Sequence, residues 1–538
     1  MAKSLYIPPA DRGFVSTDPE IAAVDASVRW PVLVCFLSAV HWMVVGTFLL
    51  VYASSLTHPQ NTFPIISLLV DLAANCRFFT YGHIWPAAVD ALVYGWASTA
   101  GLGLAIWLLA RMGRTPARAP AALMTGIIFW NLGIATGLTG IFLGDSTGIE
   151  LLEFPAYASW ILWVAYALFG LWAVATYLGR KPGHDHIAQS WLLVALFAFP
   201  WLYATGTTLL CTDLHSASPD LSHTSSQSAW VYPLPGSGVM QALLSSWYVH
   251  GLFTLWLAPI GLALLYYLIP KMSGLDLQWG SRAQLAFWTW IIFAPWTAVH
   301  DLVGGPFPAD TVTFGLIMSG LIFIPVAFIG MNLVGTALRG EEMQGHHGGI
   351  VFPFLVLSAF FFVIAGASEQ LLSIRSVNEV LRFTMFRECD MFLWVYGFFS
   401  FMVFGSIYYI VPRLLNFGWR SSFLIRAHYY ASLYGILLFL ALVGFGGIVQ
   451  GLSLESTDPL VTIVNAYQQA NNFYIASTMC IALISIGNGI FALHLGWMLL
   501  DWLRQRVQGN RLASEILLEP YTPETEVPVK AAPRKAHV

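Results

Sequence analysis

The stretch QALLSSWYVHGLFTLWLAPIGLALLYYLIP, residues 241–270, contains no Asp, Glu, Lys or Arg. A membrane-crossing helix needs roughly 20 mostly apolar residues, because the hydrocarbon core is about 30 Å thick. Twelve runs of this kind lie along the chain, so we expect an all-α polytopic membrane protein with twelve transmembrane helices. The runs are near 32–53, 83–110, 121–144, 155–179, 190–210, 241–270, 283–303, 312–338, 350–373, 388–412, 427–452 and 474–503.

The composition agrees with this class of protein. Only 10% of the 538 residues are charged and 57% are hydrophobic, whereas soluble proteins carry about 25% charged residues. A soluble enzyme, a disordered protein and a nucleic-acid binder are therefore excluded, and the lipid bilayer is the expected surrounding. We expect a cytoplasmic N-terminal tail over 1–30, a transmembrane domain over 31–506 and a disordered cytoplasmic tail over 507–538.

The basic residues orient this bundle. With the N-terminus inside, 20 of the 24 Lys and Arg fall in inner segments, and only Arg77, Arg375, Arg382 and Arg387 fall in outer loops. Inner loops of membrane proteins carry the excess of Lys and Arg. Both termini should therefore be cytoplasmic, as in a multi-pass protein of a bacterial inner membrane.

The five cysteines contain no C-x-x-C pair, which argues against covalent c-type haem and against a cysteine-ligated metal centre. Cys76 and Cys211 both fall at the predicted outer surface. An oxidising periplasm permits a disulfide between them, although two outer cysteines need not be neighbours.

Two predicted helices end alike. Residues 265–271 read LYYLIPK and residues 407–413 read IYYIVPR, four helices further along. Each end has a Tyr pair suited to the membrane interface, a Pro and then a cation. The match predicts an internal repeat of four helices.

Charged and imidazole side chains inside a membrane are costly and point to function. No two intramembrane histidines share a helix, and the histidines at 184, 186, 346 and 347 fall in inner loops. The intramembrane candidates are His41, His83, Asp90, His250, His300, Asp301, Glu369, Glu388, Asp390 and His494.

Several local sequences resemble subunit I of the haem–copper oxidases, and in particular the catalytic subunit of the C family, the cytochrome cbb3-type oxidases. Trp247-Tyr248-Val249-His250 resembles that family's helix 6, and the segments 407–413 and 446–451 resemble its helices 10 and 11. Tyr81-Gly82 with Pro86 resembles the start of its helix 2. The resemblance implies haem b and copper as cofactors, and other membrane subunits and a c-type cytochrome as partners.

Carried over residue by residue, the copper ligands of that family are mostly missing. The helix 6 ligand matches His250, a remnant copper-ligand position. The helix 7 His pair falls on Trp296-Thr297, and the redox tyrosine of the same helix falls on Trp290.

The haem ligands are missing as well. The helix 2 position holds Ala88, and the His-x-His of helix 10 falls on Asp390 and Phe392 or, in a second register, on Arg387 and Cys389. No histidine occurs from Gly348 to Ala427. We therefore expect no haem and no copper.

These substitutions favour a non-catalytic paralogue that serves as a subunit of a respiratory membrane complex. One alternative is an active terminal oxidase or nitric oxide reductase, in which His83 and His300 are displaced haem ligands and His250 still binds copper. Another is an ion or proton transporter that uses Asp90, Glu369 and Asp390.

Packing adds two expectations. Trp290 and Phe392 should point into the bundle and fill space that holds cofactors in the family, because large dry voids are not tolerated. Asp90 should accept a hydrogen bond from a Tyr, Trp, Asn or Ser, since an unpaired buried carboxylate is costly.

The topology can be tested by cysteine labelling in intact cells. A cysteine in the loop at 346–347 should react only after the membrane is permeabilised, whereas a cysteine at 460 should react from outside. Labelling of both positions from the same side would contradict the twelve-helix topology.

Overall fold

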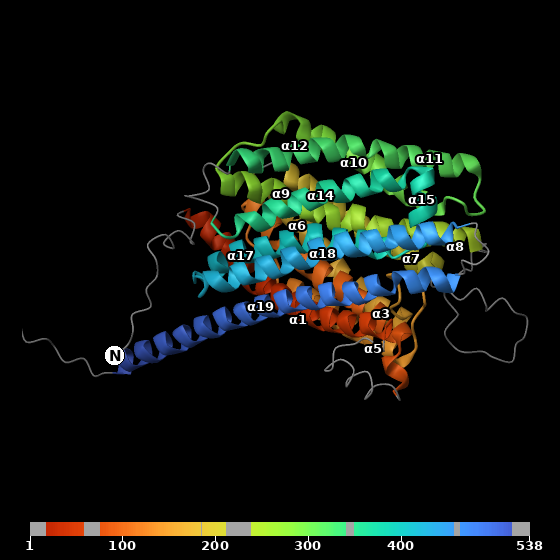
Figure 1. Cartoon of the computed structure of the whole chain (residues 1–538). Coiled ribbons are helices and arrows are strands. Elements are labelled where there is room, and N and C mark those ends of the chain that lie inside the picture. Colours follow the sequence, from red (N-terminus) through yellow and green to blue (C-terminus); the bar gives the residue numbers. More distant parts are fainter. Residues whose placement is uncertain are drawn as a thin grey trace, which may run out of the picture.

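The computed structural model describes residues 18–58, 76–183, 186–210, 238–340, 349–456 and 463–518. Within these residues the chain forms a bundle of nearly parallel helices and has no strand (Figure 1). The elements are α1 (Pro19–Leu56), η3 (Arg77–Phe79), α3 (Tyr81–Asp90), η4 (Ala91–Ser98), α4 (Thr99–Gly113), α5 (Pro120–Leu143), α6 (Ala156–Leu178), α7 (Ile187–Leu210), α8 (Gly238–Gly251), η6 (Leu252–Leu257), α9 (Ala258–Ser273), η7 (Gly280–Arg282), α10 (Ala283–Phe293), η8 (Ala294–Leu302), α11 (Ala309–Leu321), α12 (Phe323–Gly340), α14 (Phe352–Leu372), α15 (Arg375–Leu381), α16 (Phe386–Phe392), η10 (Leu393–Ser400), α17 (Phe401–Leu415), α18 (Ser422–Leu454) and α19 (Ile463–Leu518).

The predicted all-α membrane fold is confirmed. Within the described ranges, eleven helices are long and apolar enough to cross a membrane. The remaining predicted span, 283–303, is split, because the α-helix α10 ends at Phe293 and the chain continues as the 3₁₀ helix η8. Pro295 lies at the start of η8, where its missing N–H breaks the α-helical hydrogen-bond pattern.

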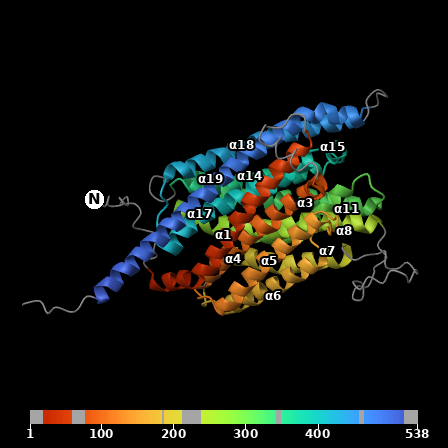
Figure 2. The same ribbon diagram turned by 90° about the horizontal axis from the view of Figure 1, so that it is seen from below.

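Three of the spans form the centre of the bundle. These are α3–η4–α4, α8–η6–α9 and α16–η10–α17, and in each of them 94% of the most apolar window is buried. The other spans bury only 39–50% of theirs, because one side of each faces outward. In Figure 2, α18 and α19 lie along one edge of the bundle, and α6 and α7 lie along the opposite edge.

Each central helix contains a π-helical segment at the same place. The repeat that the sequence predicted for α8–η6–α9 and α16–η10–α17 therefore extends to α3–η4–α4. An aromatic ring in each π segment is followed eleven residues later by a second aromatic, and four residues after that by a cation. These sets are Trp96, Trp107 and Arg111; Trp256, Tyr267 and Lys271; and Phe398, Tyr409 and Arg413.

Hydrogen bonds at the π segments join the central helices to one another. Trp256 Nε1 donates to Ser98 Oγ at 3.0 Å, and Trp96 Nε1 donates to Ser400 Oγ at 2.8 Å. The Ser400 hydroxyl in turn donates to the Val395 carbonyl at 2.8 Å, inside η10. In the wider π turn, the Val395 carbonyl can thus accept a hydrogen bond from the hydroxyl of Ser400, five residues later.

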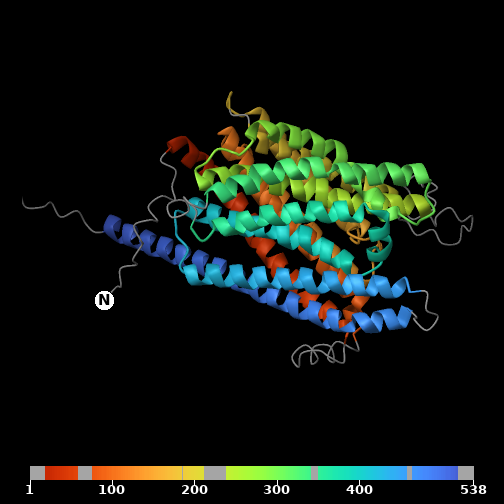
Figure 3. The same ribbon diagram turned by 45° about the horizontal axis from the view of Figure 1, so that its top comes forward.

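Both terminal helices extend further than the sequence predicted. α1 begins at Pro19, where the Asp18 side chain accepts from the Glu20 N–H at 3.0 Å and caps the helix. α19 continues to Leu518 and projects beyond the bundle (Figure 3). Cys76 forms no disulfide with another cysteine of the described ranges, but Cys211 lies outside them, so their pairing stays a prediction.

The contacts between the central helices predict the effect of removing one hydroxyl. Ser400→Ala leaves Trp96 Nε1 buried without an acceptor, which should cost about 1–3 kcal/mol in the free energy of unfolding. Ser38→Ala is the matched control, because the Ser38 hydroxyl bonds only within its own helix, and it should change stability by less than about 0.5 kcal/mol. Equal unfolding curves for the two variants in detergent would show that the Trp–Ser contact is not stabilising.

Candidate functional site

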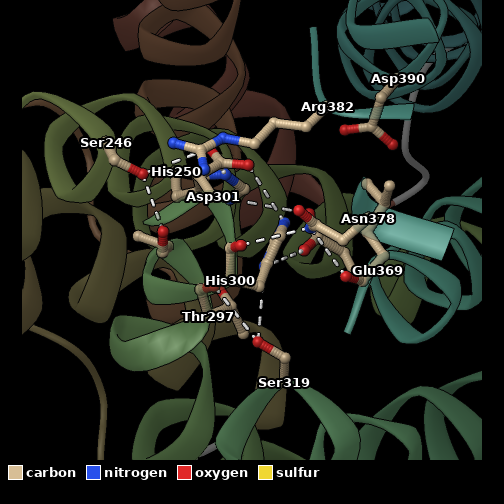
Figure 4. A network of polar contacts seen from close by, with 12 residues as sticks. Ser246, His250, Thr297, His300, Asp301, Ser319, Glu369, Asn378, Arg382 and Asp390 are labelled. Carbon is tan, nitrogen blue, oxygen red and sulfur yellow. Dashed lines mark hydrogen bonds and ion pairs between the residues drawn. The ribbon is translucent and has the colours of Figure 1, made fainter. Parts of the chain in front are cut away.

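Four candidate residues from three separate spans meet near one end of the bundle. His250 is in α8, His300 and Asp301 are in η8, and Glu369 is in α14. Figure 4 shows the two imidazole rings between the two carboxyl groups. The ring centroids of His250 and His300 are 5.0 Å apart, so the residues form one group, which we call the His–Asp–Glu cluster.

Asp301 faces the Nε2 atoms of both histidines. Its Oδ2 lies 2.9 Å from His250 Nε2, and its Oδ1 lies 3.4 Å from His300 Nε2. Ser246 in α8 donates to Asp301 Oδ2 at 3.2 Å and to the Ala298 carbonyl at 2.8 Å. Asp301 is therefore held against α8 and lies between the two rings.

Glu369 faces the opposite nitrogens. Its two carboxyl oxygens lie 3.7 Å from the Nδ1 atoms of His250 and His300. Glu369 is 3% exposed and His300 is fully buried, whereas the Asp301 side chain is 26% exposed. The cluster thus has a closed inner side at Glu369 and a more open outer side at Asp301.

His300 lies on the 3₁₀ helix η8, three residues after the second of the copper positions that sequence reasoning carried over. A 3₁₀ helix has about three residues per turn, so side chains three apart lie on one face. Thr297 and His300 therefore share a face, and the buried His300 contacts His250.

Other polar side chains surround the cluster. Asn378 in α15 donates to the His300 carbonyl at 3.2 Å, and Ser319 Oγ lies 3.5 Å from His300 Nδ1. The charge of Arg382 acts on Asp301, and burial lowers the pKa of this guanidinium. Asp390 accepts from Ser368 at 2.8 Å, and it lies near enough to His250 and Asp301 to interact with their charges.

Asp90 belongs to a different place and has a different partner. The predicted hydrogen bond from a Tyr, Trp, Asn or Ser is wrong: within the described residues, neither Asp90 oxygen accepts from such a group. The charge of Glu153, in the connection between α5 and α6, acts on Asp90. Burial raises the pKa of Glu153 to about 8.

These surroundings separate Asp90 from the other two acids that a transporter would use. The charge of Glu153 acts on Asp90, whereas Glu369 faces His250 and His300, and Asp390 lies near the same cluster. A transporter would be favoured if Asp90 and Glu369 faced a shared internal cavity, and their different neighbours give no support for one.

His83 is not brought to the cluster. It lies at the start of α3, where its Nδ1 is 2.7 Å from the Thr80 hydroxyl. His494 is fully buried, and its ring packs against Trp419 at 4.9 Å between centroids. These two histidines and His250 therefore occupy three separate places.

The residues at the family's copper positions do not fit that metal centre. Copper there takes three imidazoles, of which only His250 is in place. The Trp296 side chain is 47% exposed, and the Thr297 hydroxyl donates to the Ala294 carbonyl at 3.0 Å.

The haem positions do not fit either. Ala88 offers no ligand atom, and Phe392 stacks on Phe439 with ring centroids 4.2 Å apart. Beside Phe392, a cavity of about 30 Å³ remains between α1, η4, η10 and α19, which is room for only one or two water molecules.

Trp290 and Phe392 point into the bundle, as predicted. Trp290 is 1% exposed and Phe392 is 7% exposed. Trp290 Nε1 donates to the Thr254 carbonyl at 2.9 Å, and its ring packs on Phe362.

The threefold repeat supplies a signal that sequence reasoning missed. Asp90, His250 and Phe392 each lie six residues before the aromatic residue of a π segment. The three central helices thus present an acid, an imidazole and an apolar ring at equivalent positions. The repeated VYG at 93–95 and 395–397 could have revealed this equivalence.

The comparisons with known proteins agree with this architecture. The family described as Cytochrome C and Quinol oxidase polypeptide I matches residues 30–484. The chain is 23% identical over 499 residues to the "Cytochrome c oxidase subunit 1 homolog, bacteroid" of Bradyrhizobium diazoefficiens, covering 91% of this chain and 84% of the relative. It is also 23% identical to the "Cbb3-type cytochrome c oxidase subunit CcoN1" of Stutzerimonas stutzeri, covering 81% of this chain and 86% of the relative.

A solved structure shares the fold. A chain of a heme-copper terminal oxidase dimer, determined by cryo-electron microscopy, superimposes with a TM-score of 0.62 at 14% identity, covering 90% of this chain and 84% of that one. With the family match spanning most of the bundle, the chain belongs to the cytochrome c and quinol oxidase polypeptide I family.

Proposed function

We propose that this chain is a cofactor-depleted member of its family, which serves as a membrane subunit of a respiratory complex and does not itself reduce oxygen or nitric oxide. The proposal rests above all on Phe392. Haem iron needs an axial ligand such as imidazole, and at this helix 10 position the chain has a ring that packs on Phe439.

The copper side gives further support. His250 Nε2 is 2.9 Å from Asp301 Oδ2. The positions of the other two copper ligands of the family hold Trp296, which is exposed, and Thr297, whose hydroxyl donates to the Ala294 carbonyl. Copper of the family type requires three imidazoles, and this donor set is too poor for it.

A role in a complex follows from the family. Subunit I proteins of this family usually work with other membrane subunits. We propose that the bundle keeps such contacts, with other membrane subunits and a c-type cytochrome as the partners to look for, at a bacterial inner membrane.

The test is the absorption spectrum and copper content of the full chain, purified in a mild detergent from its native membrane. We expect no Soret band, no stoichiometric copper, and co-purification of other membrane subunits. The Stutzerimonas stutzeri relative, isolated and assayed in the same way, is the control for loss of cofactor during purification.

A haem b spectrum with one or two haems per chain would overturn the proposal. It would instead favour an active oxidoreductase with displaced ligands, and His83→Ala and His300→Ala would then identify the ligands by loss of the band.

A further inference from the structure

We propose that His250, His300 and Asp301 bind one divalent transition-metal ion of the zinc or ferrous class. This site differs from the three-histidine copper centre of the family, because it combines one residue of α8 with two residues of η8. One potential ligand atom from each residue lies within 4.8 Å of the other two. The proposal goes beyond the proposed function, because it assigns a metal ion to residues that the loss of haem and copper leaves without a role.

The ligand atoms already converge. A tetrahedral site with Zn–N bonds of about 2.0–2.1 Å holds its ligand atoms roughly 3.3 Å apart. His250 Nε2 and His300 Nε2 lie 2.9 and 3.4 Å from the two Asp301 oxygens, so small side-chain rotations would close the site.

The buried ring of His300 has a nitrogen with no hydrogen bond to the described residues, which indicates that a metal ion can bind there. It is fully buried, and its Nε2 makes no hydrogen bond within the described residues. Buried polar atoms are nearly always hydrogen-bonded, and this nitrogen faces Asp301. A metal ion between His300 and Asp301 would satisfy it.

Glu369 supplies the outer support that metal-binding histidines normally have. Such histidines usually donate their other ring N–H to a carboxylate, which fixes the ring and raises its basicity. Here both Nδ1 atoms face the same Glu369 carboxyl at 3.7 Å. One carboxyl group therefore faces the Nε2 atoms as a ligand, and a second faces the Nδ1 atoms as a support.

The donor set determines the class of metal. Two imidazoles and one carboxylate suit zinc or ferrous iron, and three protein ligands leave a coordination position open. The Asp301 side chain is 26% exposed and the His250 side chain is 12% exposed, which leaves a path to the predicted outer face.

The local charge also favours a cation. Asp301, Glu369 and Asp390 gather around the two rings, and the nearby cations are Arg382 and Arg387. Arg387 forms an ion pair with Glu150 at 2.5 Å, so much of its charge is already paired. A divalent ion would offset the cost of burying these carboxylates.

The experiment is a titration of the full chain in detergent with Co²⁺, followed by the visible absorption of bound cobalt. Wild type should bind about one Co²⁺ per chain and release it to Zn²⁺. Asp301→Asn and His300→Gln, which preserve side-chain size, should weaken binding at least about 10-fold. Glu369→Gln should weaken it by about 10- to 100-fold, as expected of an outer-shell partner.

Two control variants test for adventitious binding. His83→Ala removes a histidine outside the cluster, and the double change His346→Ala with His347→Ala removes a loop pair. Both should bind Co²⁺ like wild type. Equal binding by wild type, Asp301→Asn and His300→Gln would overturn the proposal, as would a folded wild type that binds neither metal.

A measurement that leaves the cluster unchanged keeps the test valid if the cluster variants do not fold. X-ray absorption of the zinc-loaded double loop variant should show two imidazoles and oxygen around the metal. A shell that contains sulfur, or that lacks imidazole, would contradict the proposed site.

Discussion

Hydrogen bonds between tryptophan and serine at the π segments hold the centre of this bundle together. Trp256 donates to Ser98 and Trp96 donates to Ser400, so the central helix α3–η4–α4 is tied to both of the others. Apolar packing alone would not fix the register of three hydrophobic helices, because lipid tails are as apolar as their side chains. The Trp N–H donors and the Ser hydroxyl acceptors must meet in an interior without water, and this requirement sets the register of the helices. It thereby also positions the residues one or two helical turns from each π segment.

Three residues that bear on function lie within two helical turns of these hydrogen bonds. Asp90, His250 and Phe392 precede the three π segments at equivalent positions, yet each has a different environment. Asp90 experiences the charge of Glu153, His250 lies between Asp301 and Glu369, and Phe392 stacks on Phe439. The same backbone framework thus carries three unlike chemistries, which explains how a member of an oxidase family can keep its fold while its ligand positions change.

The fold was largely accessible from the sequence. Long uncharged runs locate membrane spans reliably, because an unpaired charge in lipid is so costly. The matching ends LYYLIPK and IYYIVPR revealed two of the three helices of the internal repeat. The burial of Trp290 and Phe392 followed from the need to fill space. The extensions of α1 and α19 were missed, because a helix can continue into water beyond the bilayer without any apolar signal.

The site was accessible only in part. His250, His300, Asp301 and Glu369 were each marked as costly residues within a membrane, but their meeting depends on how α8, η8 and α14 pack together, which composition and spacing do not specify. The Asp90 partner was missed for a related reason, since Glu153 lies in a connecting segment whose path over the bundle is set by tertiary contacts. Local patterns locate polar residues along a helix, whereas loops and helix type decide which of them meet.

The most direct test of the central claim is a cryo-electron microscopy map of the chain isolated from its native membrane, at a resolution that shows side chains. The account predicts Phe392 stacked on Phe439 and Trp290 against Phe362, with side-chain density filling the centre of the bundle. Planar porphyrin density between α3 and α16, with Phe392 displaced from Phe439, would contradict it.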